Sequence, residues 1–111
     1  MNRAEILDTA KSLITGDRQE QYGDAAQIYK VVGKMWGDYI FEGFAKRYGP
    51  IYDSDSKQIT GFVFSPQTVL TMLALMKIGR EVSGNHKDDN FIDAAGYIAL
   101  AGEIAGSDEQ P

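Results

Sequence analysis

Residues 65–84 read SPQTVLTMLALMKIGREVSG, and they indicate a buried helix. Ser65 followed by Pro66 is typical of a helix N-terminus, because serine caps the first N–H groups and proline fits the first helical position. Residues 69–78 are apolar around nearly the whole circumference of such a helix. A helix of this kind belongs at the centre of a bundle. We therefore expect residues 66–83 to form the most buried helix of the fold.

The rest of the chain predicts three further helices. Apolar residues recur at three- and four-residue spacing over residues 2–15, 24–48 and 89–105, as on the buried stripe of an amphipathic helix. Asn2 and Asp24 stand where N-caps are expected. The prediction is an all-α, four-helix bundle-like domain.

Residues 50–64 interrupt this helical pattern. Short apolar runs flank a polar centre, which fits either a short β-hairpin or an irregular excursion. Nothing else divides the chain. We expect one domain over residues 1–105 and a polar tail over residues 106–111.

Composition narrows the range of functions. The chain has 111 residues and no cysteine, which excludes a disulfide scaffold, a thiolate metal site and a cysteine nucleophile. The first residues do not resemble a secretion signal, and no apolar run is long enough to span a membrane. The formal net charge of −5 argues against binding long nucleic acid, which requires a basic face. We therefore expect a soluble cytoplasmic protein whose partner is a small molecule.

Lys77 breaks the apolar pattern of the 66–83 helix. It lies on the same side as Leu70 and Ala74, counting about 100° per residue. A lysine aimed into a core either extends to water or meets an anion. The anion could be a ligand phosphate or a buried carboxylate, and Arg80 follows one turn later.

The 89–105 helix supplies carboxylates on an apolar background. Asp89 and Asp93 are four residues apart and so share one face, where like charges repel unless a cation lies between them. Acids near a helix N-terminus are favoured for structural reasons alone, because that end of the helix is positive. This reason explains the presence of Asp88 and largely explains that of Asp89. That reason does not reach Asp93, which lies deeper in the helix, and we predict a polar site role for it.

Two polar segments complete the candidate site. Residues 17–24 read DRQEQYGD and contain Arg18, Tyr22 and Asp24, although a solvated connection between helices would have the same composition. The lone His86 and its neighbour Lys87 occupy the connection before the last helix, where a histidine is more often solvated than a ligand.

Three motifs in this order resemble a phage- and prophage-associated protein family. They are DRQEQYGD at residues 17–24, MKIGR at residues 76–80 and HKDDNFIDAAGY at residues 86–97. That family in turn resembles the MazG-like all-α nucleoside triphosphate pyrophosphohydrolases, and its patterns are similar to the nucleotide-modification-associated domains of phages.

The resemblance implies a helical homodimer or homotetramer that binds Mg²⁺ and a nucleotide. MazG-like enzymes hold the metal with acids from two helices, and an activated water cleaves between the α and β phosphorus atoms. Asp93 matches the last of these acids, and Asp89 is the nearest substitute for its partner, because Asn90 occupies the matching position. Gln67 and Thr68 stand where the first acidic pair is expected, which departs from the enzyme pattern.

These observations define one candidate site and three competing functions. Asp93, Asp89 and Lys77 are the candidate catalytic residues, with Asp89 and Asp93 as Mg²⁺ ligands. The candidate substrate-binding residues are Arg18, Tyr22, Asp24, Lys77, Arg80, His86 and Lys87. The protein is then a pyrophosphohydrolase, a non-catalytic nucleotide binder such as a phage sponge, or a purely structural helical oligomer. Four or more converging acids would favour the enzyme, and one or two would favour the binder.

Overall fold

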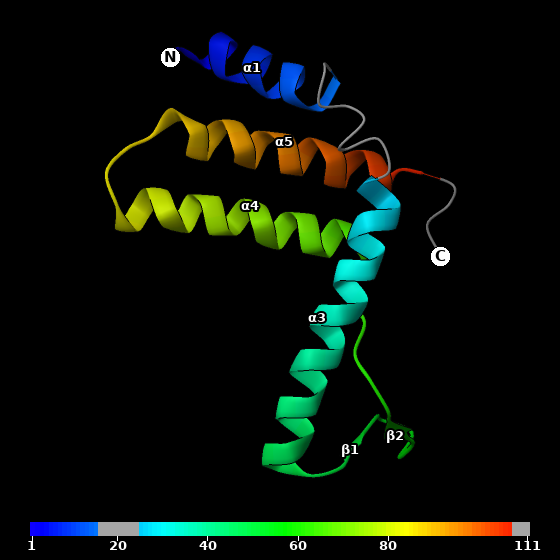
Figure 1. Ribbon diagram of the computed structural model, residues 1–111. Helices are drawn as coiled ribbons and strands as arrows, with labels where there is room; N and C mark the ends of the chain where they lie inside the picture. The colour runs from blue at the N-terminus through cyan, green and yellow to red at the C-terminus, as the bar shows by residue number, and fades with distance from the viewer. Residues whose placement is uncertain (16–24, 108–111) are drawn as a thin grey trace.

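The computed structural model describes residues 1–15 and 25–107, and it confirms the all-α prediction (Figure 1). The described residues form four helices and a two-stranded sheet. The elements in chain order are α1 (Arg3–Thr15), α3 (Ala25–Tyr48), β1 (Ile51–Tyr52), β2 (Gln58–Ile59), α4 (Pro66–Ser83) and α5 (Asp88–Ala105). The predicted cap Asp24 lies outside the described residues.

Local capping explains where two helices begin. The Asn2 Oδ1 atom accepts a hydrogen bond from the Glu5 amide at 2.9 Å, and the Glu5 Oε1 atom accepts one from the Asn2 amide at 3.3 Å. This reciprocal pair satisfies two N–H groups that the helix itself leaves unbonded. At α4, the Ser65 Oγ atom accepts from the Thr68 amide at 3.3 Å, and Pro66 occupies the first turn.

Helices α1, α5 and α4 form three layers. The short 84–87 connection turns the chain back, so α4 and α5 run antiparallel side by side, and α1 packs on the far side of α5 (Figure 1). Leu70 on α4 and Leu100 and Ile104 on α5 belong to the buried core. Ile14 on α1 packs against the same cluster.

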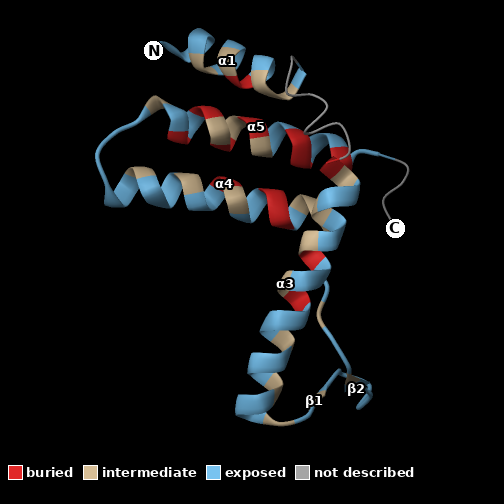
Figure 2. Ribbon diagram, viewed as in Figure 1, coloured by how far each residue is buried: buried red, intermediate tan, exposed pale blue. Residues whose placement is uncertain are grey.

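The prediction that the 66–83 helix is the most buried is wrong for the single chain. Among the described residues, α5 contains seven buried residues and α4 three (Figure 2). The reason is the layer order, because α5 is covered by α4 on one side and by α1 on the other. Leu75 and Met76, in the middle of α4, are 63% and 47% exposed.

Helix α3 crosses the end of the α4–α5 pair and projects away from it (Figure 1). The radius of gyration is 17.0 Å, whereas a compact chain of this length has about 13 Å. Residues 62–64 run back along α3 over Gly33 and Gly37. A Cβ atom at either glycine would overlap the carbonyl oxygen of Phe64 or Phe62. The close contact of α3 with this segment therefore requires glycine at both positions.

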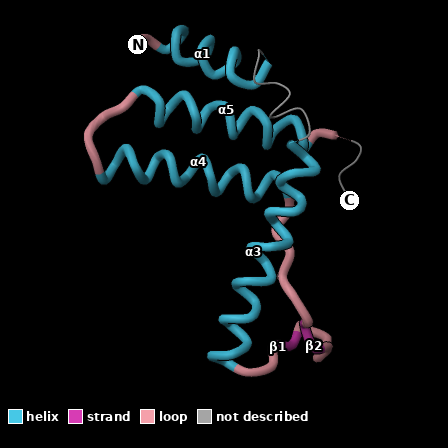
Figure 3. Tube along the Cα trace, viewed as in Figure 1, coloured by secondary structure: helices cyan, strands magenta, loops and turns pink. Residues whose placement is uncertain are grey.

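Residues 50–64 contain the β-hairpin, one of the two structures that their pattern allowed (Figure 3). Strands β1 and β2 are antiparallel, with Ile51 opposite Ile59. In the turn, the Asp53 Oδ1 atom accepts hydrogen bonds from the amides of Asp55 and Lys57 at 2.8 and 3.0 Å. The polar centre of this segment is thus the turn itself.

Candidate functional site

Lys77 and Asp93 form an ion pair between α4 and α5. The Lys77 Nζ atom lies 2.9 Å from the Asp93 Oδ2 atom, and the two side chains are 17% and 32% exposed. The antiparallel packing of the two helices brings these residues together although they are 16 positions apart. Of the residues predicted to form one site, the structure therefore brings Lys77 and Asp93 into direct contact.

A small cavity lies beside Asp93, between α1 and α5. Its volume is about 120 Å³. Ile14 closes it from α1, while Asp93, Gly96 and Tyr97 contribute the α5 side. A Cβ atom added at Gly96 would lie 3.5 Å from the Ile14 Cγ2 atom, which is an ordinary contact distance. The carboxylate of Asp93 thus borders a small cavity with a mixed polar and apolar lining, which is too small by itself for a nucleotide.

Glu81 organises the connection between α4 and α5. Its Oε1 atom accepts hydrogen bonds from the Lys87 amide and the Asn90 Nδ2 atom, both at 3.0 Å. Its Oε2 atom lies 2.6 Å from the His86 Nδ1 atom. The hydrogen bond from the Lys87 amide, which has the largest effect, and the one from the Asn90 side chain lower the pKa of Glu81 to about 2. Glu81 is therefore a structural anion that holds the start of α5.

His86 lies between two carboxylates. Its Nε2 atom is 3.0 Å from Asp88 Oδ1, opposite the contact with Glu81. Hydrogen bonds to Glu81 and then Asp88 raise the pKa of His86 above its usual 6.5. Asp88 also accepts a hydrogen bond from the Met1 amino group at 3.2 Å. This hydrogen bond is the largest cause of the lowered pKa of Asp88. The side chain of His86 is thus engaged by two acids while it remains 62% exposed, as expected for a histidine in a polar loop.

The role of Glu81 was not predicted from the sequence. The signal was its position four residues after Lys77, which places both on the side of α4 that faces α5. A carboxylate at that position reaches the first turn of the next helix whenever the connection is as short as residues 84–87.

Arg80 and Lys87 line an open recess at the same end of the α4–α5 pair. We call it the basic recess. Its volume is about 310 Å³, and its lining residues are Arg80, Ser83, Gly84, Asn85, Lys87 and Asn90. The lining contains two cations, one hydroxyl and two amides, but no carboxylate. His86 is not among these residues.

The predicted Mg²⁺ ligands do not form a metal-binding group with other described residues. Asp89 is exposed, and Asp93 is paired with Lys77. Within residues 1–15 and 25–107, no three acids or histidines come together in a way that could hold a metal ion. The described donor set therefore does not fit Mg²⁺. Arg18, Tyr22 and Asp24 lie outside the described residues, as do the acids Asp17 and Glu20.

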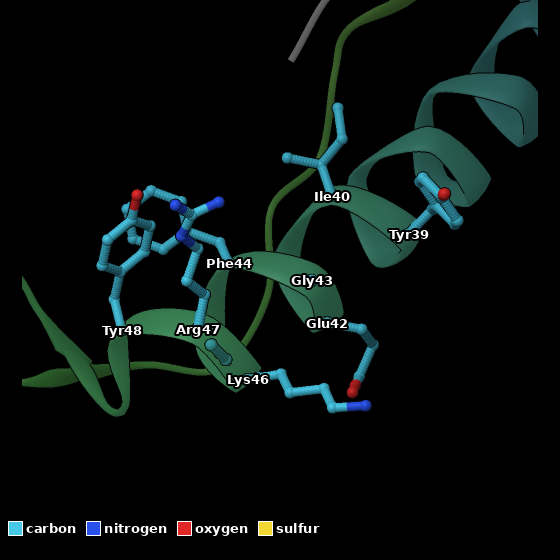
Figure 4. Close-up of a pocket in the computed structure, with 9 residues that line it drawn as sticks. Tyr39, Ile40, Glu42, Gly43, Phe44, Lys46, Arg47 and Tyr48 are labelled. Atoms are coloured by element: carbon cyan, nitrogen blue, oxygen red, sulfur yellow. The ribbon is translucent and has the colours of Figure 1, made fainter.

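A broad recess lies on the projecting half of α3 (Figure 4). Its volume is about 840 Å³, and all nine lining residues come from the single helical run 39–48. The rings of Phe44 and Tyr48 are 4.6 Å apart, and Arg47 lies 5.6 Å from the centre of the Tyr48 ring. One helix cannot enclose a ligand, so this recess is an open surface and not part of the Lys77–Asp93 site.

Comparison of the sequence with known proteins identifies the family of this chain. Residues 5–105 match the family described as Domain of unknown function (DUF6378). The chain belongs to the DUF6378 family. It is also 33% identical over 95 residues to the Gene 55 protein of Mycobacterium phage L5. That alignment covers 86% of this chain but 49% of the phage protein, so the chain spans about half the length of this relative.

The relative from Mycobacterium phage L5 confirms the resemblance to a phage-associated family that the three motifs indicated. The motifs DRQEQYGD, MKIGR and HKDDNFIDAAGY all fall within the matched residues 5–105. No solved structure matches the chain. In the described part of the chain, no helix is both long and apolar enough to cross a membrane.

Proposed function

We propose that this DUF6378 domain binds a nucleotide through its phosphates. The observation that carries the proposal is the basic recess, because two cations without a carboxylate line one hollow in a chain of net charge −5. Its volume of about 310 Å³ lies at the lower end of the range for small-molecule sites. Arg80 and Lys87 were both predicted as phosphate contacts from the sequence.

The chemistry of the recess suits a phosphate group. The guanidinium of Arg80 offers a planar pair of donors that can bind two phosphate oxygens at once, and the Lys87 amine acts as a compact point charge. Lys77 lies three residues before Arg80, on a neighbouring side of α4 about 60° away. Lys77 and Asp93 do not line the basic recess, and because Asp93 already neutralises Lys77, the ion pair adds no net charge beside it.

The non-catalytic binder is favoured over the pyrophosphohydrolase. A MazG-like reaction requires several acids around Mg²⁺, and the described residues assemble no such group. Glu81 and Asp93 are instead engaged with the α5 start and with Lys77. The MazG-like kinship and Mg²⁺ dependence remain the alternative proposal, for which Asp17, Glu20 and Asp24 would have to supply the missing ligands.

Nucleotide binding is tested by calorimetric titration of nucleoside mono-, di- and triphosphates, with inorganic phosphate as a further probe. The Arg80→Gln/Lys87→Gln variant should bind at least tenfold more weakly, because each charge-assisted hydrogen bond contributes about 1.5–3 kcal/mol. Lys30→Gln, which removes an exposed cation from α3, is the matched control and should bind as the wild type does.

Two results would decide against this proposal. Failure of every nucleotide to bind at millimolar concentration would overturn it, as would equal binding by the wild type and the double variant. Titrations with and without Mg²⁺, combined with assays of phosphate and pyrophosphate release, distinguish the pyrophosphohydrolase from the non-catalytic binder. Turnover that requires Mg²⁺ would establish the hydrolase, whereas binding without turnover would support the binder.

Self-association into a homodimer or homotetramer is part of the same proposal. Its support is the open shape of the chain and the exposed middle of α4, where Leu75 and Met76 face solvent. A helix that is apolar all round but covered on one side leaves a surface that a second copy can cover.

A further inference from the structure

The outward face of α4 carries no charged residue. Met72, Leu75, Met76, Ile78 and Val82 all lie on it, each between 37% and 82% exposed. The remaining positions of this face are Thr68, Thr71, Gly79 and Ser83. The three charged residues of α4, which are Lys77, Arg80 and Glu81, project from the other half of the helix. We call this surface the uncharged face.

The uncharged face continues onto α5 across a groove. The groove has a volume of about 340 Å³, and Leu75 and Ile78 form its α4 wall. Phe91 and Ile98 form the α5 wall and are 40% and 49% exposed. The lining also includes small residues from both helices, Thr71, Ala74, Ala94 and Ala95. A ridge of large side chains thus stands beside a hollow with small ones.

We propose that the uncharged face is the interface at which two copies of this chain pair about a twofold axis. In such a contact the same surface meets itself, so the α4 ridge of each copy can enter the groove of the other. This inference rests on the proposed self-association and names the surface responsible for it. It does not depend on nucleotide binding.

Charge and size both favour a second copy as the occupant. Two chains of net charge −5 repel each other, and a contact that contains no charged residue avoids the strongest part of that repulsion. The cores of protein interfaces are depleted in charged residues in the same way. Seven large apolar side chains, five on the uncharged face and two on the α5 wall of the groove, are 37% to 82% exposed, which provides an apolar surface for an interface of standard size, roughly 800 Å² per partner.

The proposed interface lies opposite the Lys77–Asp93 ion pair. Leu75 and Lys77 are two residues apart on α4, so their side chains leave the helix about 160° apart. Phe91 and Asp93 are related in the same way on α5. Pairing through the uncharged face would therefore leave the Lys77–Asp93 ion pair and its cavity open to solvent in both copies.

A second apolar surface, on α3, is the competing interface. Ile28, Val31, Met35 and Tyr39 recur at three- and four-residue spacing, on the side of α3 away from Gly33 and Gly37, and are 45% to 83% exposed. Charged residues adjoin this stripe, among them Lys34, Asp38 and Glu42. On α4 a single charged residue, Arg80, adjoins the uncharged face, four residues after Met76, which is why we assign the interface to α4.

The experiment compares Leu75→Glu with Met35→Glu by sedimentation velocity at micromolar concentration. The two side chains are matched, since each is 63% exposed on its helix and each variant introduces one negative charge. We expect the wild type and Met35→Glu to sediment as dimers and Leu75→Glu as a folded monomer that still binds nucleotide as the wild type does. Circular dichroism checks that each variant keeps its helix content.

The outcomes separate this inference from the broader proposal. A wild type that is monomeric at 100-fold higher concentration would overturn both self-association and the interface. A dimeric Leu75→Glu beside a monomeric Met35→Glu would overturn the α4 interface alone.

A cysteine probe keeps the test decisive if Leu75→Glu does not fold. The chain has no cysteine of its own, so Leu75→Cys introduces a single thiol. Under mild oxidation it should form a covalent dimer at low micromolar concentration, whereas Met35→Cys should remain uncrosslinked. The reverse pattern would refute the α4 interface.

Discussion

The Lys77–Asp93 ion pair should contribute measurable coupling energy to folding. Two unit charges about 4 Å apart attract by about 1 kcal/mol in water and about 4 kcal/mol at an effective dielectric constant near 20. The 17% and 32% exposure of the two side chains places the pair between these limits, and partial desolvation offsets some of the attraction. We expect a net coupling of about 1.5 kcal/mol, above the 0.2–1 kcal/mol of fully exposed pairs.

A double-mutant cycle measures this coupling directly. Asp93→Asn should lower the free energy of unfolding by about 2 kcal/mol, and the Lys77→Met change should then cost little in the Asp93→Asn background, because the charge it would leave unpaired is already gone. The assay is urea denaturation followed by circular dichroism at pH 7 and a fixed protein concentration. Asp89→Asn, an exposed acid one turn earlier on α5, should change stability by less than about 0.5 kcal/mol.

The same cycle separates a structural role from a ligand role. A coupling energy below about 0.3 kcal/mol would refute the argument that the ion pair holds α4 to α5. If Asp93→Asn in addition abolished nucleotide binding without loss of stability, the carboxylate would serve the ligand alone. Loss of stability with unchanged binding would make the ion pair a purely structural contact.

Two further predictions concern the α3 packing and the α4–α5 connection. Gly33→Ala should destabilise the protein by about 1–3 kcal/mol or more, because its Cβ atom would overlap the Phe64 carbonyl oxygen, whereas Gly43→Ala on the same helix meets no atom and should be neutral or stabilising by up to about 1 kcal/mol in urea denaturation. Equal effects of the two substitutions would contradict this close approach. The stability difference between the wild type and Glu81→Gln should be largest from pH 4.5 to 6.5. The lowered pKa of Glu81 means that its contribution is lost as the pH falls from 4.5 towards 2, and the raised pKa of His86 means that its contribution is lost as the pH rises above 6.5. A difference that stayed constant as the pH fell below 4.5 and rose above 6.5 would contradict the proposed contributions of Glu81 and His86 to folding.

Local signals in the chain were sufficient for the helices and for one contact of the site. Ser65 and Pro66 begin α4 because capping chemistry acts within four residues. The approach of Lys77 to Asp93 also followed from local reasoning, since two helices joined by a short connection must run antiparallel. The hairpin was one of two structures that residues 50–64 allowed, because a polar turn alone does not specify strand pairing.

The layer order was decided only by the tertiary structure. An apolar circumference indicates that α4 is covered but does not name what covers it, so the burial predicted for α4 is found instead on α5, between α1 and α4. The role of Glu81 depended likewise on the path of the 84–87 connection, which brings the Lys87 amide and the Asn90 side chain to one carboxylate. Periodicity reports which side of a helix avoids water, whereas the partner of that side is set by contacts between residues far apart in the chain.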